Sequence, residues 1–275
     1  MTIKIIVAHH KEGDFYKDKI HLPIHVGSTL AKNNLGILRD DTKVNISHLN
    51  PFYCELTATF WAWKNINAEY LGLCHYRRYF SKNKDSKLST KNNLAKVYHY
   101  FNSIFSKNYK GTFFYHQRTI KKNQSTKIVR DFSMWLEKDI EKENVDIYAL
   151  KPVLHLNKTN FDVFSVLGSE FIDQLKNIVD TNFPDYYKSL NLTLSSNTLH
   201  YANMVVMKSD LFNEYCEFIF GVLKIHFEKN KQMVEETDSY LRIPGYMGEL
   251  LTNTFIIHKQ NYGLKIKLLK SVFIE

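Results

Sequence analysis

Short apolar runs alternate along the chain with longer amphipathic stretches. The apolar runs predict strands at residues 3–8, 70–74, 146–150 and 203–207. The amphipathic stretches predict helices at residues 50–65, 127–144, 161–181, 209–229 and 246–258. Alternation of this kind is typical of an α/β fold in which helices cover a mixed or parallel sheet.

The helix predicted over residues 50–65 has the clearest local signals. Asn50 is the expected N-cap and Pro51 the first helical residue, because both residue types favour those positions. Four apolar residues follow at helical spacing, namely Phe52, Leu56, Phe60 and Trp63. We expect these four side chains to face the core.

Length and composition predict a single domain over residues 1–275, with 44% hydrophobic residues to build its core. No apolar run reaches the 18 or more residues of a membrane span, and the first strand lacks a signal-peptide pattern. The three cysteines are widely spaced and odd in number, which favours a reducing compartment over a disulfide framework. These features predict a cytoplasmic protein.

The positive charge is concentrated in one segment. Residues 81–130 contain ten Lys and two Arg but a single acid, so this segment carries a charge of +11. The remaining residues sum to −2, which gives the net charge of +9. We interpret the segment as a basic, aromatic-rich insertion that docks on an anionic membrane surface and guides an acceptor substrate to the site. A solvated insertion whose aromatic residues complete the core is the alternative. No known RNA-binding signature is present, so nucleic acid is not an expected partner.

Two predicted strands end in candidate ligand-binding residues. Because ligands of open α/β sheets bind at the carboxyl ends of strands, we expect Ala8, His9 and His10 to lie at one site with the segment His75–Phe80. We interpret His9 and His10 as nucleoside contacts. Loop histidines that bond only within the protein are the alternative, and His25 is a weaker candidate.

Adjacent arginines form the strongest local motif, in the sequence His75-Tyr-Arg-Arg-Tyr-Phe80. The guanidinium groups of Arg77 and Arg78 can bind a diphosphate through bidentate hydrogen bonds. His75 precedes them at the end of the strand. A surface loop with a cation–π pair is the alternative interpretation.

Three further charged residues are candidates for the site. Glu55 and Lys64 belong to the first predicted helix and could contact the donor, although an acid in a first turn also favours the helix dipole. Glu249 lies early in the last predicted helix. It could act as a general base that removes a proton from an acceptor hydroxyl. A dipole-stabilised helix acid is again the alternative.

The chain contains no Asp-x-Asp pair, the motif with which many nucleotide-sugar enzymes hold a divalent metal. We therefore expect no metal cofactor, and we expect Arg77 and Arg78 to stabilise the leaving diphosphate. A metal-dependent enzyme with His75 and a distant acid as ligands is one alternative. A binding module for RNA or anionic lipid, without enzymatic activity, is the other.

Four segments resemble a bacterial family first catalogued as a domain of unknown function. They are NPFYCELTATFWAWKN, YLGLCHYRRYF, HYANMVVMKSDLFNEYCEFIF and RIPGYMGELL. Members of that family occur in capsule, exopolysaccharide and lipopolysaccharide gene clusters and include galactosyl- and galactofuranosyltransferase-like proteins. The resemblance covers nearly the whole chain except residues 81–130.

The resemblance implies a GT-A-like fold and a glycosyltransferase that moves a sugar from a UDP-sugar donor to a lipid-linked glycan. His75 to Arg78 would occupy the place of the Asp-x-Asp motif. Asn203 would begin a strand on the acceptor side, and Gly245 to Glu249 would supply an acceptor-side acid. The family pattern has an Arg after that Glu, whereas this chain has Leu250.

Overall fold

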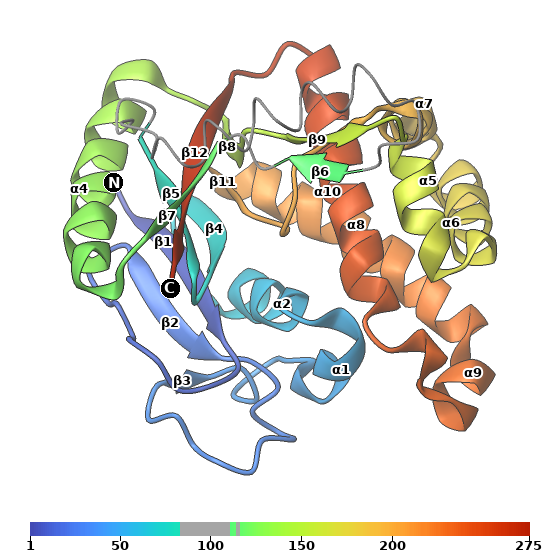
Figure 1. Ribbon diagram of the computed structural model, residues 1–275, viewed down its shortest axis with the longest axis horizontal. Coiled ribbons are helices and arrows are strands. Elements are labelled where there is room, and N and C mark those ends of the chain that lie inside the picture. The colour runs from blue at the N-terminus through green and yellow to red at the C-terminus, as the bar shows by residue number, and fades with distance from the viewer. Residues whose placement is uncertain (83–110, 114–115) are drawn as a thin grey trace.

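The computed structural model describes residues 1–82, 111–113 and 116–275 (Figure 1). Within them, a nine-stranded mixed sheet forms the centre of the molecule. Its strands are β1 (Ile3–His9), β2 (His21–His25), β3 (Leu38–Arg39), β4 (Tyr70–His75), β5 (Arg78–Ser81), β7 (Gln117–Ile120), β8 (Ile147–Leu150), β11 (Val205–Lys208) and β12 (Ile266–Ile274). A second, three-stranded sheet consists of β6 (Gly111–Phe113), β9 (Val153–Leu156) and β10 (Thr198–Leu199).

Parallel pairing brings several strand ends to one edge of the large sheet. β3, β2, β1 and β4 are consecutive parallel neighbours. β11 runs antiparallel between β4 and β8, and β12 runs parallel to β8. β5 turns back from the end of β4 and pairs antiparallel with β12. The carboxyl ends of β1 and β4 therefore lie side by side, where loops can gather a ligand.

Helices cover both faces of this sheet (Figure 1). The helices of the described residues are α1 (Asn50–Tyr53), α2 (Leu56–Asn65), α4 (Lys122–Glu143), α5 (Asn160–Phe164), α6 (Ser169–Asn182), α7 (Pro184–Ser195), α8 (Ser209–Lys229), α9 (Lys231–Glu236) and α10 (Ile243–Asn261), of which α2, α4 and α8 pack directly on the sheet. Short 3₁₀ turns occupy Ser47–Leu49, Ser165–Leu167 and Asp238–Tyr240.

β1 is buried on both faces because its side chains alternate between two cores. Ile5 and Val7 belong to the core that includes Phe132 of α4. Ile6 and Ala8 belong to a smaller core with Trp61 of α2. A strand covered by helices on both faces is the expected centre of an α/β fold.

The predicted α/β fold with a mixed sheet flanked by helices is confirmed, and so is the helix at residues 209–229. The single helix predicted over residues 50–65 is wrong: Cys54 has φ 52° and separates α1 from α2. The helix predicted over residues 161–181 is likewise divided before Gly168, where φ is 122°. Both conformations lie outside the helical region, so regular i to i+4 bonding stops there.

Much of the basic segment 81–130 lies outside the described residues, so its predicted contact with a membrane stays a prediction. Its described carboxyl-terminal part is integrated in the main fold. β7 pairs with β12, and α4 begins at Lys122 rather than at the predicted residue 127. In the part of the chain that the structure describes, we find no helix with the length and apolar character of a membrane span.

Gly72 lies where β4 is pressed between β1 and β11. A Cβ atom at this position would lie 2.4 Å from the carbonyl oxygen of Val205 and 2.6 Å from a methyl group of Val206. We expect Gly72→Ala to lower the free energy of unfolding by about 1–3 kcal/mol, the usual cost of overpacking, measured by denaturant unfolding. Gly13→Ala is the matched control, because nothing lies within 4 Å of its Cβ position. Equal stability of the two variants would contradict this account.

Candidate active site

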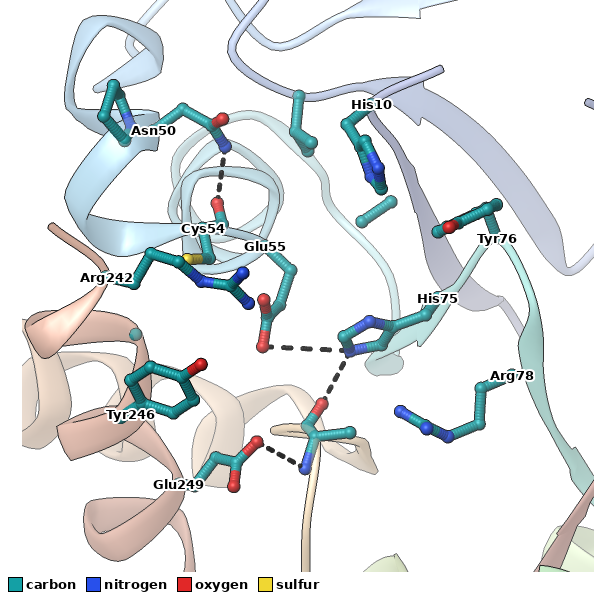
Figure 2. Close-up of a pocket in the computed structure, with 15 residues that line it drawn as sticks. His10, Asn50, Cys54, Glu55, His75, Tyr76, Arg78, Arg242, Tyr246 and Glu249 are labelled. Carbon is teal, nitrogen blue, oxygen red and sulfur yellow. Dashed lines mark hydrogen bonds and ion pairs between the residues drawn. The ribbon is translucent and has the colours of Figure 1, made fainter. Parts of the chain in front are cut away.

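A cleft of about 510 Å³ opens at the carboxyl ends of β1 and β4 (Figure 2). Ala8 and His10 contribute to one wall from the end of β1. The junction between α1 and α2 and the first turns of α10 form the opposite wall, and the hairpin between β4 and β5 adds a third. Segments far apart in the sequence thus meet at the edge where ligands of α/β folds bind.

The break between α1 and α2 directs Glu55 into the cleft. Cys54 has a positive φ of 52°, and the side-chain amide of Asn50 donates to the Cys54 carbonyl over 2.7 Å. Asn50 is therefore the first residue of α1 and not the predicted N-cap, a position held by Leu49. Its side chain instead satisfies a carbonyl group that the interrupted helix leaves without its usual partner.

A buried carboxylate supports this wall from behind. Asp40 is fully buried, and its oxygens accept hydrogen bonds from the backbone amides of Gly27 and Ser28 and from the hydroxyl groups of Ser28, Ser47 and Thr57 at 2.5–3.1 Å. Because a buried charge is costly unless it is hydrogen-bonded, these segments must remain together. Asp40 thus fixes α2 to the loops that follow β2.

Asn203 links the acidic wall to α10. Its amide group donates to Glu55 Oε1 over 2.9 Å and to the Gly245 carbonyl over 3.3 Å. Its oxygen accepts from the Thr252 hydroxyl over 3.0 Å. Asn203 is almost completely buried, so it positions the cleft residues and does not itself line the cleft.

The backbone of Ala202, which lines the cleft, holds two ionisable side chains, those of Glu249 and His75 (Figure 2). Its amide donates to Glu249 Oε1 over 3.0 Å, and its carbonyl accepts from His75 Nε2 over 2.8 Å. Nε2 of His75 therefore carries a proton. The same nitrogen lies 3.8 Å from Glu55 Oε1.

Glu249 has the electrostatic environment of a proton acceptor. Burial, followed by the negative charge of Glu55, raises its pKa from 4.5 to about 7. The Ala202 amide, Arg78 and Arg242 act in the opposite direction but are weaker. A carboxyl group with a pKa near neutrality can exchange a proton with a bound hydroxyl group at physiological pH.

Arg78 enters the cleft from the first position of β5. Its Nε donates to Gln117 Oε1 over 3.1 Å, and the same oxygen accepts from the Tyr201 hydroxyl over 2.9 Å. The guanidinium carbon lies 4.9 Å from the centre of the Tyr201 ring. These contacts hold the guanidinium group in one orientation.

Backbone strain is concentrated around the cleft. Seven described residues other than glycine have positive φ values, namely Lys43, Cys54, Asn144, Asn157, Ala202, Asn203 and Arg242. Cys54, Ala202 and Arg242 line the cleft, and none of them is a residue type that tolerates this conformation well. Such strain persists where the surrounding structure fixes it, and it is enriched at functional sites.

The structure brings together most of the residues that the sequence predicts for the site. Those that line the cleft are Ala8, His10, Glu55, His75, Arg78, Gly245 and Glu249. Arg242, Tyr246 and Cys54 also line it, although the sequence-based prediction did not assign them to the site. Their only signal was that they belong to two of the family-like segments, NPFYCELTATFWAWKN and RIPGYMGELL.

Four predicted residues do not line the cleft: Asn203 is buried behind its wall, and the other three lie elsewhere. His9 is fully buried against Phe15, and burial lowers its pKa to about 4, so it is neutral and out of reach of a ligand. Lys64 is exposed on α2, and its amino group lies 3.1 Å from the centre of the Trp63 ring. Arg77 is exposed in a neighbouring cleft. His9 and Lys64 belong to elements that turn them away from the cleft, whereas Arg77 is in the turn before β5.

Among the described residues, no cluster of three or more His, Cys, Asp or Glu side chains is arranged to hold a metal ion. His75 and Glu55 are neighbours in the cleft, but they form only a pair.

Comparisons with known proteins show what the chain as a whole is similar to. No curated protein matches the chain. A solved apo structure described as a WbbM bifunctional glycosyltransferase is similar over the whole of this chain, with 28% sequence identity and a TM-score of 0.82. The match covers 46% of that larger chain, so this chain spans about half its length. The sequence model of a domain of unknown function, DUF4422, matches residues 4–260. The chain therefore belongs to the DUF4422 family.

Proposed function

We propose that this chain is a glycosyltransferase with a GT-A-like fold that moves a sugar from a UDP-sugar to a surface-polysaccharide acceptor. Galactose and galactofuranose are the first candidates for the sugar. One observation carries the proposal: Glu249 and Arg78 line the same cleft at the carboxyl ends of parallel strands. The pKa of Glu249 is raised to about 7, and Arg78 is a cation. The similarity to a bifunctional glycosyltransferase supports it.

The donor would occupy the side of the cleft next to β1 and β4. Ala8 and His10 would contact the nucleoside, and the ring of Tyr76 lies 4.9 Å from that of His10. The guanidinium group of Arg78 would bind the diphosphate and stabilise the charge that develops on it as the sugar leaves. His75 would lie beside that diphosphate in the place where metal-dependent relatives carry acidic ligands.

The acceptor would approach from the side of α10. Glu249 would take the proton of the acceptor hydroxyl while that oxygen attacks the anomeric carbon and UDP departs with the electrons of the broken bond. A single displacement of this kind inverts the anomeric configuration. Asn203 and Gly245, which were predicted on the acceptor side, would act by holding Glu55 and the start of α10 in place.

A lipid-linked glycan at the inner face of the cytoplasmic membrane is the proposed acceptor. The support for this part is the +11 charge of residues 81–130, since Lys residues near an anionic leaflet contribute about 1 kcal/mol each.

A panel of nucleotide sugars tests the function directly. We expect slow, UDP-releasing hydrolysis of one UDP-sugar in the absence of acceptor, and stabilisation of the protein by UDP in a thermal-shift assay. Absence of both signals with every UDP-sugar would refute the proposal.

Arg78→Ala should raise the Kd for UDP by about 10- to 100-fold, because a hydrogen-bonded charge is worth about 1.5–3 kcal/mol. Arg78→Lys should restore little of the affinity for UDP, because an ammonium group cannot form the bidentate hydrogen bonds of a planar guanidinium group. Isothermal titration calorimetry measures the change. Arg77→Ala is an informative comparison, because Arg77 is directed into a neighbouring cleft and its loss should change the Kd by less than about threefold. Equal losses of UDP affinity in Arg78→Ala and Arg77→Ala would contradict the assignment of Arg78 as the diphosphate ligand.

Glu249→Gln should leave UDP binding intact and lower kcat by about 10²-fold or more, the usual scale for the loss of a general base. In the wild type, the rate should rise with pH through about 7, because the base must be ionised. The Gln variant should lose this dependence. A rate equal to that of the wild type would exclude Glu249 as the base.

Protein stability provides an independent check on Glu249. A folded-state pKa above the unfolded value means that the folded state binds the additional proton. Stability is therefore lost as pH rises from about 4.5 to about 7. The stability of Glu249→Gln should not decrease over this pH range. At pH 8 this variant should therefore be more stable than the wild type, even though it is less active.

Activity should survive an excess of EDTA, because we propose that Arg78 and its neighbours neutralise the diphosphate in a chain without an Asp-x-Asp pair. The assay is sugar transfer before and after exhaustive chelation. Loss of activity that manganese or magnesium restores would instead indicate the metal-dependent alternative.

A further inference from the structure

Arg242 has a backbone conformation that is unfavourable for an arginine. It immediately precedes α10 with φ 64°, and its amide donates to the Pro51 carbonyl over 3.0 Å. Glycine adopts this conformation at no steric cost, whereas a residue with a Cβ atom is strained there. The stability of this turn is therefore no reason for an arginine at position 242.

Electrostatics within the protein account for this arginine only in part, through longer-range attraction to Glu55 and Glu249. Arg242 is the N-cap residue of α10, and a cation near a helix N-terminus is repelled by the positive end of the helix dipole. Its guanidinium group forms no ion pair with a carboxylate among the described residues. Its neighbours are the Tyr246 ring, whose centre lies 5.4 Å away, and the Cys54 thiol. Burial raises the pKa of that thiol to about 12, so it is neutral.

The side chain nevertheless faces the cleft. Figure 2 shows Arg242 on the helical wall and Arg78 on the β-hairpin wall of the same cleft, with Glu55 and His75 between them in this view. Arg78 also forms no ion pair with a carboxylate in the described part of the chain, and only its Nε has a hydrogen-bond partner there, Gln117. Two guanidinium groups on opposite walls, neither in a contact ion pair with a carboxylate of the described residues, are suited to one ligand with two adjacent anionic groups.

We propose that Arg242 is the second arm of a diphosphate clamp and binds the donor together with Arg78 across the cleft. This inference rests on the proposed function and replaces the predicted pair of adjacent arginines by a pair from different elements. The diphosphate would join the sheet edge to α10, which also carries Glu249. Occupation of the clamp would thereby fix the proposed base relative to the sugar.

Arg242→Gly tests the clamp because stability and binding should change in opposite directions. Relief of the strained backbone should raise the melting temperature by about 2 °C. Loss of the guanidinium group should raise the Kd for UDP about tenfold or more and leave the Kd for uridine within about threefold. Arg242→Lys should bind UDP more tightly than the Gly variant but more weakly than the wild type.

Lys43→Gly is the matched control, because Lys43 has φ 52° on an exposed loop that does not line the cleft. It should gain stability in the same way and bind UDP as the wild type does. Calorimetric titration with UDP and uridine, and thermal unfolding without ligand, give all of these values.

The outcomes separate the two proposals. Failure of the wild type to bind UDP at all would overturn the proposed function. Binding of UDP by the wild type and by Arg242→Gly with equal affinity would overturn the clamp alone. Equal losses of UDP and uridine affinity together with a lower melting temperature would show that Arg242 only supports the fold, and would also overturn the clamp.

Discussion

One buried amide side chain connects the segments that form the cleft. Asn203 donates to Glu55 and to the Gly245 carbonyl while it accepts from Thr252. A primary amide provides donors and an acceptor in one rigid plane, so an apolar residue of similar size would leave several buried polar groups unpaired. The relative positions of the α1–α2 junction, the turn before β11 and α10 depend on this side chain.

Ala202, the residue before Asn203, positions two side chains of the cleft through its backbone atoms alone. Ala202 contributes no functional side chain of its own, yet its amide and its carbonyl, from two successive peptide groups, hold Glu249 and His75. Its left-handed conformation turns both groups toward the cleft. Positioning by main-chain atoms is rigid because the same turn is anchored by Asn203.

The sequence predicts those features of the structure that depend on local apolar patterns, and it misses those that depend on rare backbone conformations or on how distant segments pack. Strands such as β1 and the long helix α8 were predictable because their periodic apolar residues determine which face is buried. The break at Cys54 was not, since a positive φ is rare for a cysteine and the hydrogen bond from the Asn50 side chain, four residues earlier, competes with the local helix signals. Arg77 and Arg78 were equivalent in the sequence, but only Arg78 belongs to β5 and is directed into the cleft.

The position of β12 has a consequence for the order in which the protein can assemble during translation. This strand, residues 266–274, pairs with β8, β5 and β7 and so occupies an interior place in the large sheet. A ribosome releases it after every other strand of the sheet. Until then the nascent polypeptide exposes unpaired strand edges, which are sites of aggregation. Completion of the sheet beside the cleft is therefore a late event in biosynthesis, at the stage when chaperones would protect those edges.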